Sequence, residues 1–336
     1  MSVIDFHTHF APQFSLAQAE TSEGLFGGRI RNGTFTHREG FAYPIVATAA
    51  EIEDREAWMA AHGVDVSVLS LVPQMFFYDV GAAGIDYLRA ANDELAALVA
   101  DRPHLMALAA LPLQDPAAAA TELRRVVEEL GMVGAQIGTS DPDGRYLGDA
   151  SHDPLLEAAE ALGVMLMLHP YYTSLKPGLE QYYLTNTVGV PLETTVAGAS
   201  LILSGAFDRF PRLRVLLAHG GGFLPYQLGR LDHAARVRPE GRGAATRLPS
   251  EYLGNLWFDT ITHAAAPLEF LARLAPGRIV VGSDSPFDMG DPDPVAHARA
   301  AGLDPDALDS AAASLLGGSG REPTEAGPAS GGVSNQ

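Results

Sequence analysis

The feature of this chain that most constrains its fold is a regular alternation of short apolar runs with helix-like stretches. Eight runs are rich in β-branched or large aliphatic residues, as strands that are buried on both faces should be. The predicted strands are Val3–His7, Val66–Leu71, Leu105–Leu111, Gly134–Ile137, Val164–His169, Leu213–Ala218, Leu256–Asp259 and Arg278–Ser283. The predicted helices are Glu51–His62, Asp86–Ala100, Asp115–Leu130, Pro154–Leu162, Leu192–Phe207, Phe223–Arg236, Pro267–Leu274 and Asp304–Leu316. Strands that alternate with helices indicate βαβ units and a parallel sheet.

Eight such units in about 300 residues predict a (β/α)8 TIM barrel, with a doubly wound open sheet as the alternative. Residues 11–50 follow the first strand and are too long for a plain loop, so we expect an insertion that forms a small lid or β-rich flap. Residues 170–191, after the fifth strand, form a second long loop with four tyrosines. The barrel domain is expected over residues 1–317, and the Gly/Ser/Pro-rich residues 318–336 are expected to be a disordered tail.

Charge and composition narrow the possible partners and the possible metal ligands. The formal net charge of −19 argues against nucleic acid and anionic membranes as partners. No apolar stretch approaches the roughly 20 residues that span a bilayer, and the N-terminus lacks a basic leader region, so we expect a cytoplasmic protein. The chain has no cysteine, so a transition metal would be held by imidazole, carboxylate and water.

Metal-type side chains end or directly follow four of the predicted strands. His7 and His9 belong to the first, His169 to the fifth, His219 to the sixth and Asp284 to the eighth. In a parallel barrel the carboxyl ends of all strands meet at one rim, where active sites lie. Alone, each histidine could be a hydrogen-bonded structural residue and Asp284 could cap a helix. Their coincidence on four strand ends favours a single metal site.

This set predicts a three-histidine, one-aspartate shell with an open position for water or substrate. His7, His9, His169 and Asp284 would bind one divalent ion, with Zn²⁺ as the expected metal and Mn²⁺ as the alternative. His219 would lie near enough to the bound water to exchange a proton with it.

The segments around these residues resemble the metal motifs of the amidohydrolase superfamily. More narrowly, they resemble its decarboxylase branch, typified by 2-amino-3-carboxymuconate-6-semialdehyde decarboxylase. The matching segments are Asp5–His9, His169–Pro170, Leu201–Phe207, His219–Gly222, Leu228–Arg230, Pro249–Tyr252 and Gly282–Phe287. The likeness runs from about residue 3 to about residue 316. It implies one ion per subunit, usually zinc, bound by the four residues named above. It also implies that His219 and Asp284 are catalytic, with His219 acting together with the metal-bound water.

The chain lacks the group that bridges two metal ions in binuclear members of the superfamily. That group is commonly a carboxylated lysine at the end of the fourth strand, which here ends Gln136-Ile137-Gly138. The only lysine, Lys176, follows the fifth strand, and no glutamate replaces it at the fourth. The site is therefore expected to be mononuclear.

The resemblance also implies residues that bind the substrate. The residue that matches Arg230 reaches the neighbouring subunit's pocket and holds a carboxylate, so a homodimer is expected. In the insertion the family has an Arg-Pro pair, whereas this chain has Tyr43-Pro44, with Arg38 nearby. In the loop after the fifth strand Tyr171 and Tyr182 replace tryptophans and could stack on a planar ring. The structural alternatives are a surface ion pair for Arg230 and loop packing for the tyrosines.

The sequence thus predicts a metal-dependent carboxy-lyase that decarboxylates a planar, unsaturated or aromatic carboxylic acid. A hydrolase of an amide, ester or lactone that uses the same mononuclear site is the alternative, because fold and ligands do not determine the reaction. A non-catalytic binding protein is a third possibility, which the open coordination position argues against.

Overall fold

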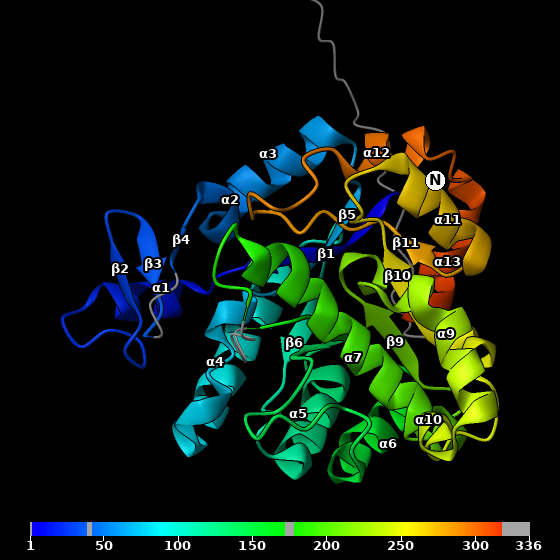
Figure 1. Ribbon diagram of the computed structural model, residues 1–336. Helices are drawn as coiled ribbons and strands as arrows, with labels where there is room; N and C mark the ends of the chain where they lie inside the picture. Colours follow the sequence, from blue (N-terminus) through cyan, green and yellow to red (C-terminus); the bar gives the residue numbers. More distant parts are fainter. Residues whose placement is uncertain (1, 39–41, 172–177, 318–336) are drawn as a thin grey trace, which may run out of the picture.

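Eight parallel strands close into a barrel, which confirms the predicted (β/α)8 TIM fold (Figure 1). The computed structural model describes residues 2–38, 42–171 and 178–317. In order around the barrel the strands are β1 (Ile4–Phe10), β5 (Val66–Leu71), β6 (Leu105–Ala110), β7 (Gly134–Ile137), β8 (Met165–Leu168), β9 (Arg214–Leu217), β10 (Leu256–Asp259) and β11 (Ile279–Val280). The segment after β11 returns to β1, where Thr8 bridges to Ser285 and the His9 amide donates a 2.8 Å hydrogen bond to the Ser285 carbonyl.

An irregularity in β1 changes which side chains face the barrel interior. The pairing of β1 with β5 shifts by one residue between Asp5 and Thr8, as a β-bulge requires. Before the shift, Ile4 and Phe6 join the interior core, and after it Thr8 hydrogen-bonds outward to the guanidinium of Arg55. The bulge therefore lets the same strand supply apolar side chains to the core and imidazoles to the rim above it.

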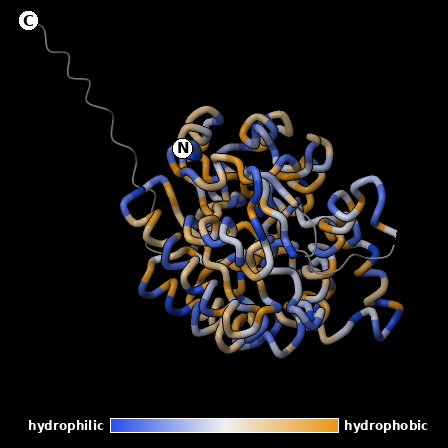
Figure 2. Tube along the Cα trace, turned by 90° about the vertical axis from the view of Figure 1, so that its left-hand side faces the viewer, coloured by the Kyte–Doolittle hydropathy of each residue, from blue (hydrophilic) through white to orange (hydrophobic). Residues whose placement is uncertain are grey.

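Helices surround the barrel and alternate with its strands, as predicted. They are α3 (Ile52–His62), α4 (Ala82–Val99), α5 (Pro116–Glu128), α6 (Asp153–Leu162), α7 (Val190–Leu203), α8 (Ala206–Arg209), α9 (Leu224–Val237), α10 (Pro239–Arg242), α11 (Ala265–Leu274), α12 (Pro294–Ala300) and α13 (Pro305–Leu316). Hydrophilic and hydrophobic stretches alternate along these outer helices, as amphipathic packing on the barrel requires (Figure 2). Among the described residues, no helix has both the length and the apolar character needed to cross a membrane.

Two details of the helices differ from the sequence prediction. The predicted helix 192–207 is interrupted because Gly205 adopts a left-handed conformation, with φ of 71°, which separates α7 from α8. Helix α12 was not predicted, although Asp293 caps it by accepting a 3.0 Å hydrogen bond from the Ala296 amide.

The insertion after β1 contains a small β-sheet. Its elements are α1 (Gln13–Glu20), β2 (Arg29–Arg31), β3 (Thr34–Thr36), β4 (Ala42–Pro44) and α2 (Ala47–Ala50). The three strands form a small antiparallel sheet that stands beside the barrel (Figure 1). Its last strand, β4, reaches the pocket described below. The tail expected at 318–336 lies outside the described residues, as do Tyr172 and Lys176.

The C-terminal helix α13 completes the core inside the barrel. Alternate strand residues form one buried cluster that is separate from the larger core between barrel and helices. Helix α13 adds Ala311, Ala312, Leu315 and Leu316 to this inner cluster. The indole of Trp257 in β10 donates a 3.2 Å hydrogen bond to the Ala311 carbonyl. The helix therefore covers the barrel interior opposite the rim that carries the histidines.

We predict that Leu315→Ala lowers the free energy of unfolding by about 2–5 kcal/mol, because Leu315 is fully buried and its truncation leaves a cavity. Chemical denaturation followed by circular dichroism measures the change. Ser314→Ala, an exposed position on the same helix, is the matched control and should alter stability by less than about 0.5 kcal/mol. Equal effects of the two substitutions would show that α13 does not complete the core.

Candidate metal-dependent active site

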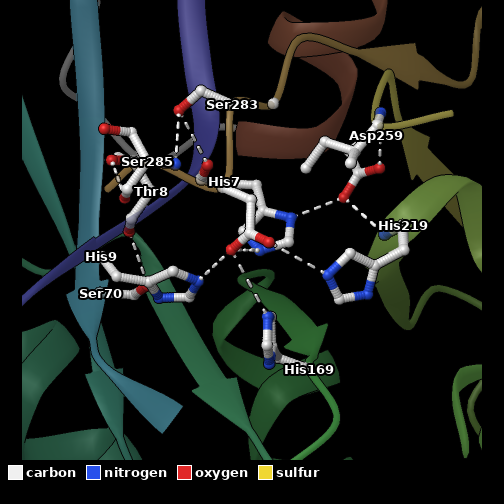
Figure 3. Close-up of polar contacts among 12 residues, drawn as sticks. His7, Thr8, His9, Ser70, His169, His219, Asp259, Ser283 and Ser285 are labelled. Carbon is white, nitrogen blue, oxygen red and sulfur yellow. Dashed lines mark hydrogen bonds and ion pairs between the residues drawn. The ribbon is translucent and has the colours of Figure 1, made fainter. Parts of the chain in front are cut away.

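The four predicted ligands converge at the carboxyl ends of three barrel strands. His7 and His9 lie in β1, while His169 and Asp284 follow β8 and β11. One potential ligand atom from each lies within 4.8 Å of all the others. Asp284 Oδ1 is 3.3 Å from His7 Nε2, 3.0 Å from His9 Nε2 and 4.0 Å from His169 Nε2. The rings of His7, His9 and His169 point toward one another (Figure 3).

The donor set fits a divalent transition metal ion. All four side chains are buried, and the Nε2 atoms of His7 and His169 have no hydrogen-bond partner among the described residues. Buried polar atoms are rarely left unpaired unless a ligand, water or ion completes them. Three imidazole nitrogens and one carboxylate oxygen suit Zn²⁺ or Mn²⁺ and leave room for a further ligand.

Each ligand histidine is oriented by a contact at its other ring nitrogen. Nδ1 of His7 lies 2.7 Å from Asp259 Oδ2, and Nδ1 of His169 lies 2.7 Å from the Pro170 carbonyl oxygen. These acceptors place the proton on Nδ1, so the lone pair of Nε2 faces the common centre.

His9 is oriented through a longer hydrogen-bond chain that starts on β7. The Gln136 amide donates to the Leu71 carbonyl at 2.9 Å, so its oxygen accepts the 2.6 Å hydrogen bond from the Ser70 hydroxyl. Ser70 Oγ then accepts from Nδ1 of His9 at 3.1 Å. Gln136 of β7 therefore supports a ligand on β1 through Ser70.

Asp259 also holds the turn that carries His219. Its carboxylate accepts hydrogen bonds from the backbone amides of His219 at 2.9 Å and Gly220 at 2.7 Å. His219 has a φ of 57°, which is unfavourable for a residue with a side chain. At Gly222 (φ 62°) a Cβ atom would lie 2.1 Å from the Pro191 carbonyl oxygen, so only glycine fits. This turn places Nε2 of His219 3.4 Å from Asp284 Oδ2, beside the ligand cluster.

The sequence did not predict that the Arg55 guanidinium is buried beneath the site. Arg55 of α3 is fully buried and donates to the Thr8 hydroxyl and, at 2.8 Å, to the His9 carbonyl. It connects α3 to the part of β1 that carries the ligands. The signal in the sequence is weak, because one arginine in an amphipathic helix resembles a surface residue.

The ionisation of the cluster follows from burial and from the carboxylates around it. Burial lowers the pKa of His7, but the carboxylates of Asp284 and Asp259 outweigh burial and raise that pKa to about 10. Burial lowers the pKa of His9 to about 4. Burial and the other imidazoles hold the pKa of His169 well below its usual value. Burial raises the pKa of Asp284, but His7 and hydrogen bonds from histidines outweigh this and keep the pKa well below its usual range.

A pocket of about 430 Å³ opens onto the ligand cluster. Tyr43 of β4 and Tyr171 line it, together with Phe287, whose ring centroid is 5.3 Å from that of His9. Tyr171 also packs on Tyr78, with centroids 4.9 Å apart, so it is fixed in the wall. Tyr182 is 85% exposed and is not part of this wall, because the chain turns there and directs its neighbour Tyr183 to the pocket instead.

The two predicted substrate-binding arginines lie elsewhere. Arg38 forms an ion pair with Asp79 and does not line the pocket, since that pair holds it beside α4. Arg230 is exposed on α9 and has no ion pair or side-chain hydrogen bond among the described residues. The alternative of a surface ion pair is thus not observed, and the nearby Asp232 accepts hydrogen bonds from Ser250 and lies 3.9 Å from Arg236.

A second hollow of about 740 Å³ lies on the other side of His219. Its wall is largely apolar and includes Phe223, Tyr226 and Phe270, which are 40%, 80% and 38% exposed. His263 also lines it. The two hollows meet at His219 and Asp284, so these residues face both.

Comparison with known families matches residues 4–317 to the amidohydrolase family. The chain belongs to this family. Among curated relatives, the 2-amino-3-carboxymuconate-6-semialdehyde decarboxylase of Dictyostelium discoideum is 38% identical over 68% of this chain, a match that spans 64% of that relative's length. The predicted superfamily is thereby confirmed.

Solved structures of similar proteins support the same assignment. The 5-carboxyvanillate decarboxylase of Sphingomonas paucimobilis has a TM-score of 0.79 and 27% identity, with 94% of this chain and 98% of that chain covered. A dihydroxybenzoic acid decarboxylase from Polaromonas sp. JS666, with bound manganese and the inhibitor 2-nitroresorcinol, has a TM-score of 0.75 and 26% identity, with 94% and 97% covered.

Removing the carboxylate that orients His7 should weaken metal binding. We predict that Asp259→Asn lowers the affinity of the apoprotein for Mn²⁺ or Zn²⁺ about 10- to 100-fold, because it disturbs both a ligand and the His219 turn. Competition with a chromophoric chelator measures the affinity. Asp288→Asn, an exposed acid in the wall of the same pocket, is the control and should leave affinity unchanged. Unchanged affinity in Asp259→Asn would contradict this role.

Metal affinity should also depend on pH. With a pKa near 10, His7 carries a proton at pH 7 in the apoprotein, and a metal ion must displace that proton to bind. Affinity should therefore rise about tenfold per pH unit between about pH 7 and 9, and level off above the pKa. His9, with a pKa near 4, adds no slope in this range. Chelator competition, corrected for the chelator's own protonation, measures the slope, and a flat profile would contradict a protonated His7.

Proposed function

We propose that the protein is a metal-dependent decarboxylase of a planar, unsaturated or aromatic carboxylic acid. The observation that carries the proposal is the position of His219 beside a three-histidine, one-aspartate cluster, at the floor of a pocket walled by aromatic rings. The names of its relatives support it, since they include decarboxylases of carboxymuconate semialdehyde, carboxyvanillate and dihydroxybenzoate.

Different residues of the chain would bind the metal, transfer the proton and orient the proton donor. A divalent ion held by His7, His9, His169 and Asp284 would polarise oxygen atoms of the substrate. His219, held by the Asp259 carboxylate, would give a proton to the ring carbon that bears the carboxylate. The carbon–carbon bond then breaks, its electron pair returns to the ring and carbon dioxide leaves. Asp284 would orient His219 through the 3.4 Å contact with its Nε2.

We propose one ion per chain, with Zn²⁺ or Mn²⁺ as the native metal. The donor set of three histidines and one aspartate suits Zn²⁺. The manganese bound in the Polaromonas relative supports Mn²⁺.

We further propose that a homodimer completes the site with Arg230. This exposed arginine follows Tyr226 by about one turn of α9, and the aromatic residues Phe223, Tyr226 and Phe270 form an exposed apolar surface around the second hollow. Exposed apolar patches of this kind mark protein interfaces. Arg230 of one subunit would then reach the substrate carboxylate of its partner.

The proposal predicts that the metal-loaded protein releases carbon dioxide from at least one member of a panel of hydroxybenzoic and unsaturated dicarboxylic acids. His219→Asn should lower kcat by about 10²- to 10⁴-fold while it keeps its metal, because it removes proton transfer and leaves the ligands in place. Coupled carbon dioxide detection and metal analysis measure the two effects. His263→Asn, at the rim of the second hollow, is the control.

Hydrolysis at the same site is the competing outcome. Transfer of one solvent ¹⁸O atom into a product, without carbon dioxide release, would replace the proposed decarboxylase by a hydrolase. Full activity of His219→Asn would refute the role of that residue.

A further inference from the structure

We propose that Arg55 is a positioning residue that sets the spacing of the ligands His9 and Asp284 and holds the β4 wall of the pocket against them. Its guanidinium does this by hydrogen-bonding to oxygen atoms of three chain segments that meet behind the ligands. The inference rests on the metal centre of the proposed function. Its test measures metal binding and local opening of the chain, so it can fail or succeed independently of the reaction.

The guanidinium of Arg55 contacts three segments that are far apart in the sequence. Its Nη2 donates to the His9 carbonyl of β1 at 2.8 Å and lies 3.5 Å from the carbonyl oxygen of Ser285, the residue after Asp284. Nη2 and Nε both donate to the Thr48 carbonyl of α2, at 2.8 Å and 3.1 Å. One rigid, planar group therefore fixes the distances between the segment of His9, the segment of Asp284 and the insertion.

A further contact joins Arg55 to the seam at which the barrel closes. Its Nη1 donates to the Thr8 hydroxyl, which in turn donates a 3.0 Å hydrogen bond to the Ser285 carbonyl. The His9 amide donates to the same carbonyl at 2.8 Å. Arg55, Thr8 and Ser285 thus form one hydrogen-bonded unit between β1 and the segment after β11, which are the two segments that supply His9 and Asp284.

The Thr48 contact extends this unit to the wall of the pocket. Helix α2, which contains Thr48, closely follows β4, and all three residues of β4 line the pocket. The Ala11 amide, just after β1, donates to the Ala49 carbonyl at 2.8 Å, so a second bond attaches α2 to the end of β1. A displacement of α2 relative to β1 would therefore move Tyr43 relative to the metal ligands.

The burial of this cation indicates a role beyond packing. Arg55 is fully buried, and its guanidinium donates to uncharged oxygens throughout the described part of the chain. The Asp5 carboxylate attracts it electrostatically but accepts its own hydrogen bonds from Ser283 and the His7 amide. An apolar side chain often replaces a buried charge without loss of stability. It cannot bridge several backbone oxygens at once, as the five N–H donors of a guanidinium can.

The metal centre reports directly on this positioning. Arg55→Lys keeps the positive charge but replaces the planar fork by one ammonium group, which cannot bridge all three segments. In the Co²⁺-loaded protein we expect this variant to change the energy and intensity of the visible absorption bands, because these bands depend on the arrangement of ligands around the ion. Affinity of the apoprotein for Zn²⁺, measured by competition with a chromophoric chelator, should fall about tenfold.

Hydrogen exchange of the metal-free protein tests the same contacts without an ion. Arg55→Lys should speed amide exchange about tenfold in peptides that contain His9 and Ala11, because their amides donate to Ser285 and Ala49 across the segments that Arg55 joins. Exchange in α6, which packs beside β7 and β8 on the opposite side of the barrel, should stay unchanged.

Two further variants separate positioning from general stability. Leu315→Ala removes a buried side chain of the inner core without touching the ligands, so it should leave the Co²⁺ spectrum and the Zn²⁺ affinity unchanged. Thr8→Val keeps the shape of the side chain but removes the hydroxyl that joins Arg55 to Ser285. It should change the spectrum more weakly than Arg55→Lys, and it replaces that variant in the test if Arg55→Lys does not fold.

The outcomes distinguish this inference from the proposed function. An unchanged spectrum and affinity in Arg55→Lys, or equal changes in Leu315→Ala, would overturn the inference, as would an unchanged spectrum in Thr8→Val if Arg55→Lys does not fold. An altered spectrum without carbon dioxide release from any acid would support the inference and refute the decarboxylase. If the wild type binds no ion, the proposed function fails, and exchange at His9 and Ala11 alone supports or overturns the role of Arg55.

Discussion

The site depends on one electrostatic constraint: three imidazole nitrogens and a carboxylate are buried around a single point that only a cation can compensate. Asp284 contributes the negative charge, and the unpaired Nε2 atoms of His7 and His169 contribute lone pairs. Without an ion, the apoprotein balances the carboxylate by a proton on His7. The surrounding structure maintains this arrangement, since Asp259, Ser70 and the Pro170 carbonyl each fix the ring that they contact. These contacts therefore hold the rings in the orientation that ligation of an ion requires.

The barrel separates the buried polar ligands at its rim from the apolar core in its interior. The bulge in β1 lets Phe6 complete an apolar interior while the next residue, His7, turns to the metal centre. Asp259 then links that centre to the strained turn at His219, so the ligand cluster and the residue proposed for proton transfer share one support. The same strands thus supply apolar side chains to the core and, at their carboxyl ends, the side chains of the metal centre.

Periodicity was enough to predict the barrel, because strands such as β6 and β8 are apolar runs with clear ends. It was also enough to predict the convergence of His7, His9, His169 and Asp284, since parallel strands bring their carboxyl ends to one rim. The supporting residues could not be predicted in this way. Ser70, Gln136 and Arg55 act through contacts between distant segments, and their residue types are common in strands and helices that bind nothing. Likewise, no pattern distinguishes Tyr182 from Tyr183, because a single backbone turn decides which ring meets the pocket.

The number of divalent ions bound per chain tests the account most directly. Plasma emission analysis of the purified protein, after loading with Zn²⁺ or Mn²⁺ and removal of free metal, should give one ion per chain for the wild type. His169→Ala removes one of the four ligands and should leave far less than one ion under the same conditions. Two ions per chain, or full occupancy in His169→Ala, would contradict a mononuclear centre formed by these four residues. No ion in the wild type would remove the chemical basis of the proposed reaction.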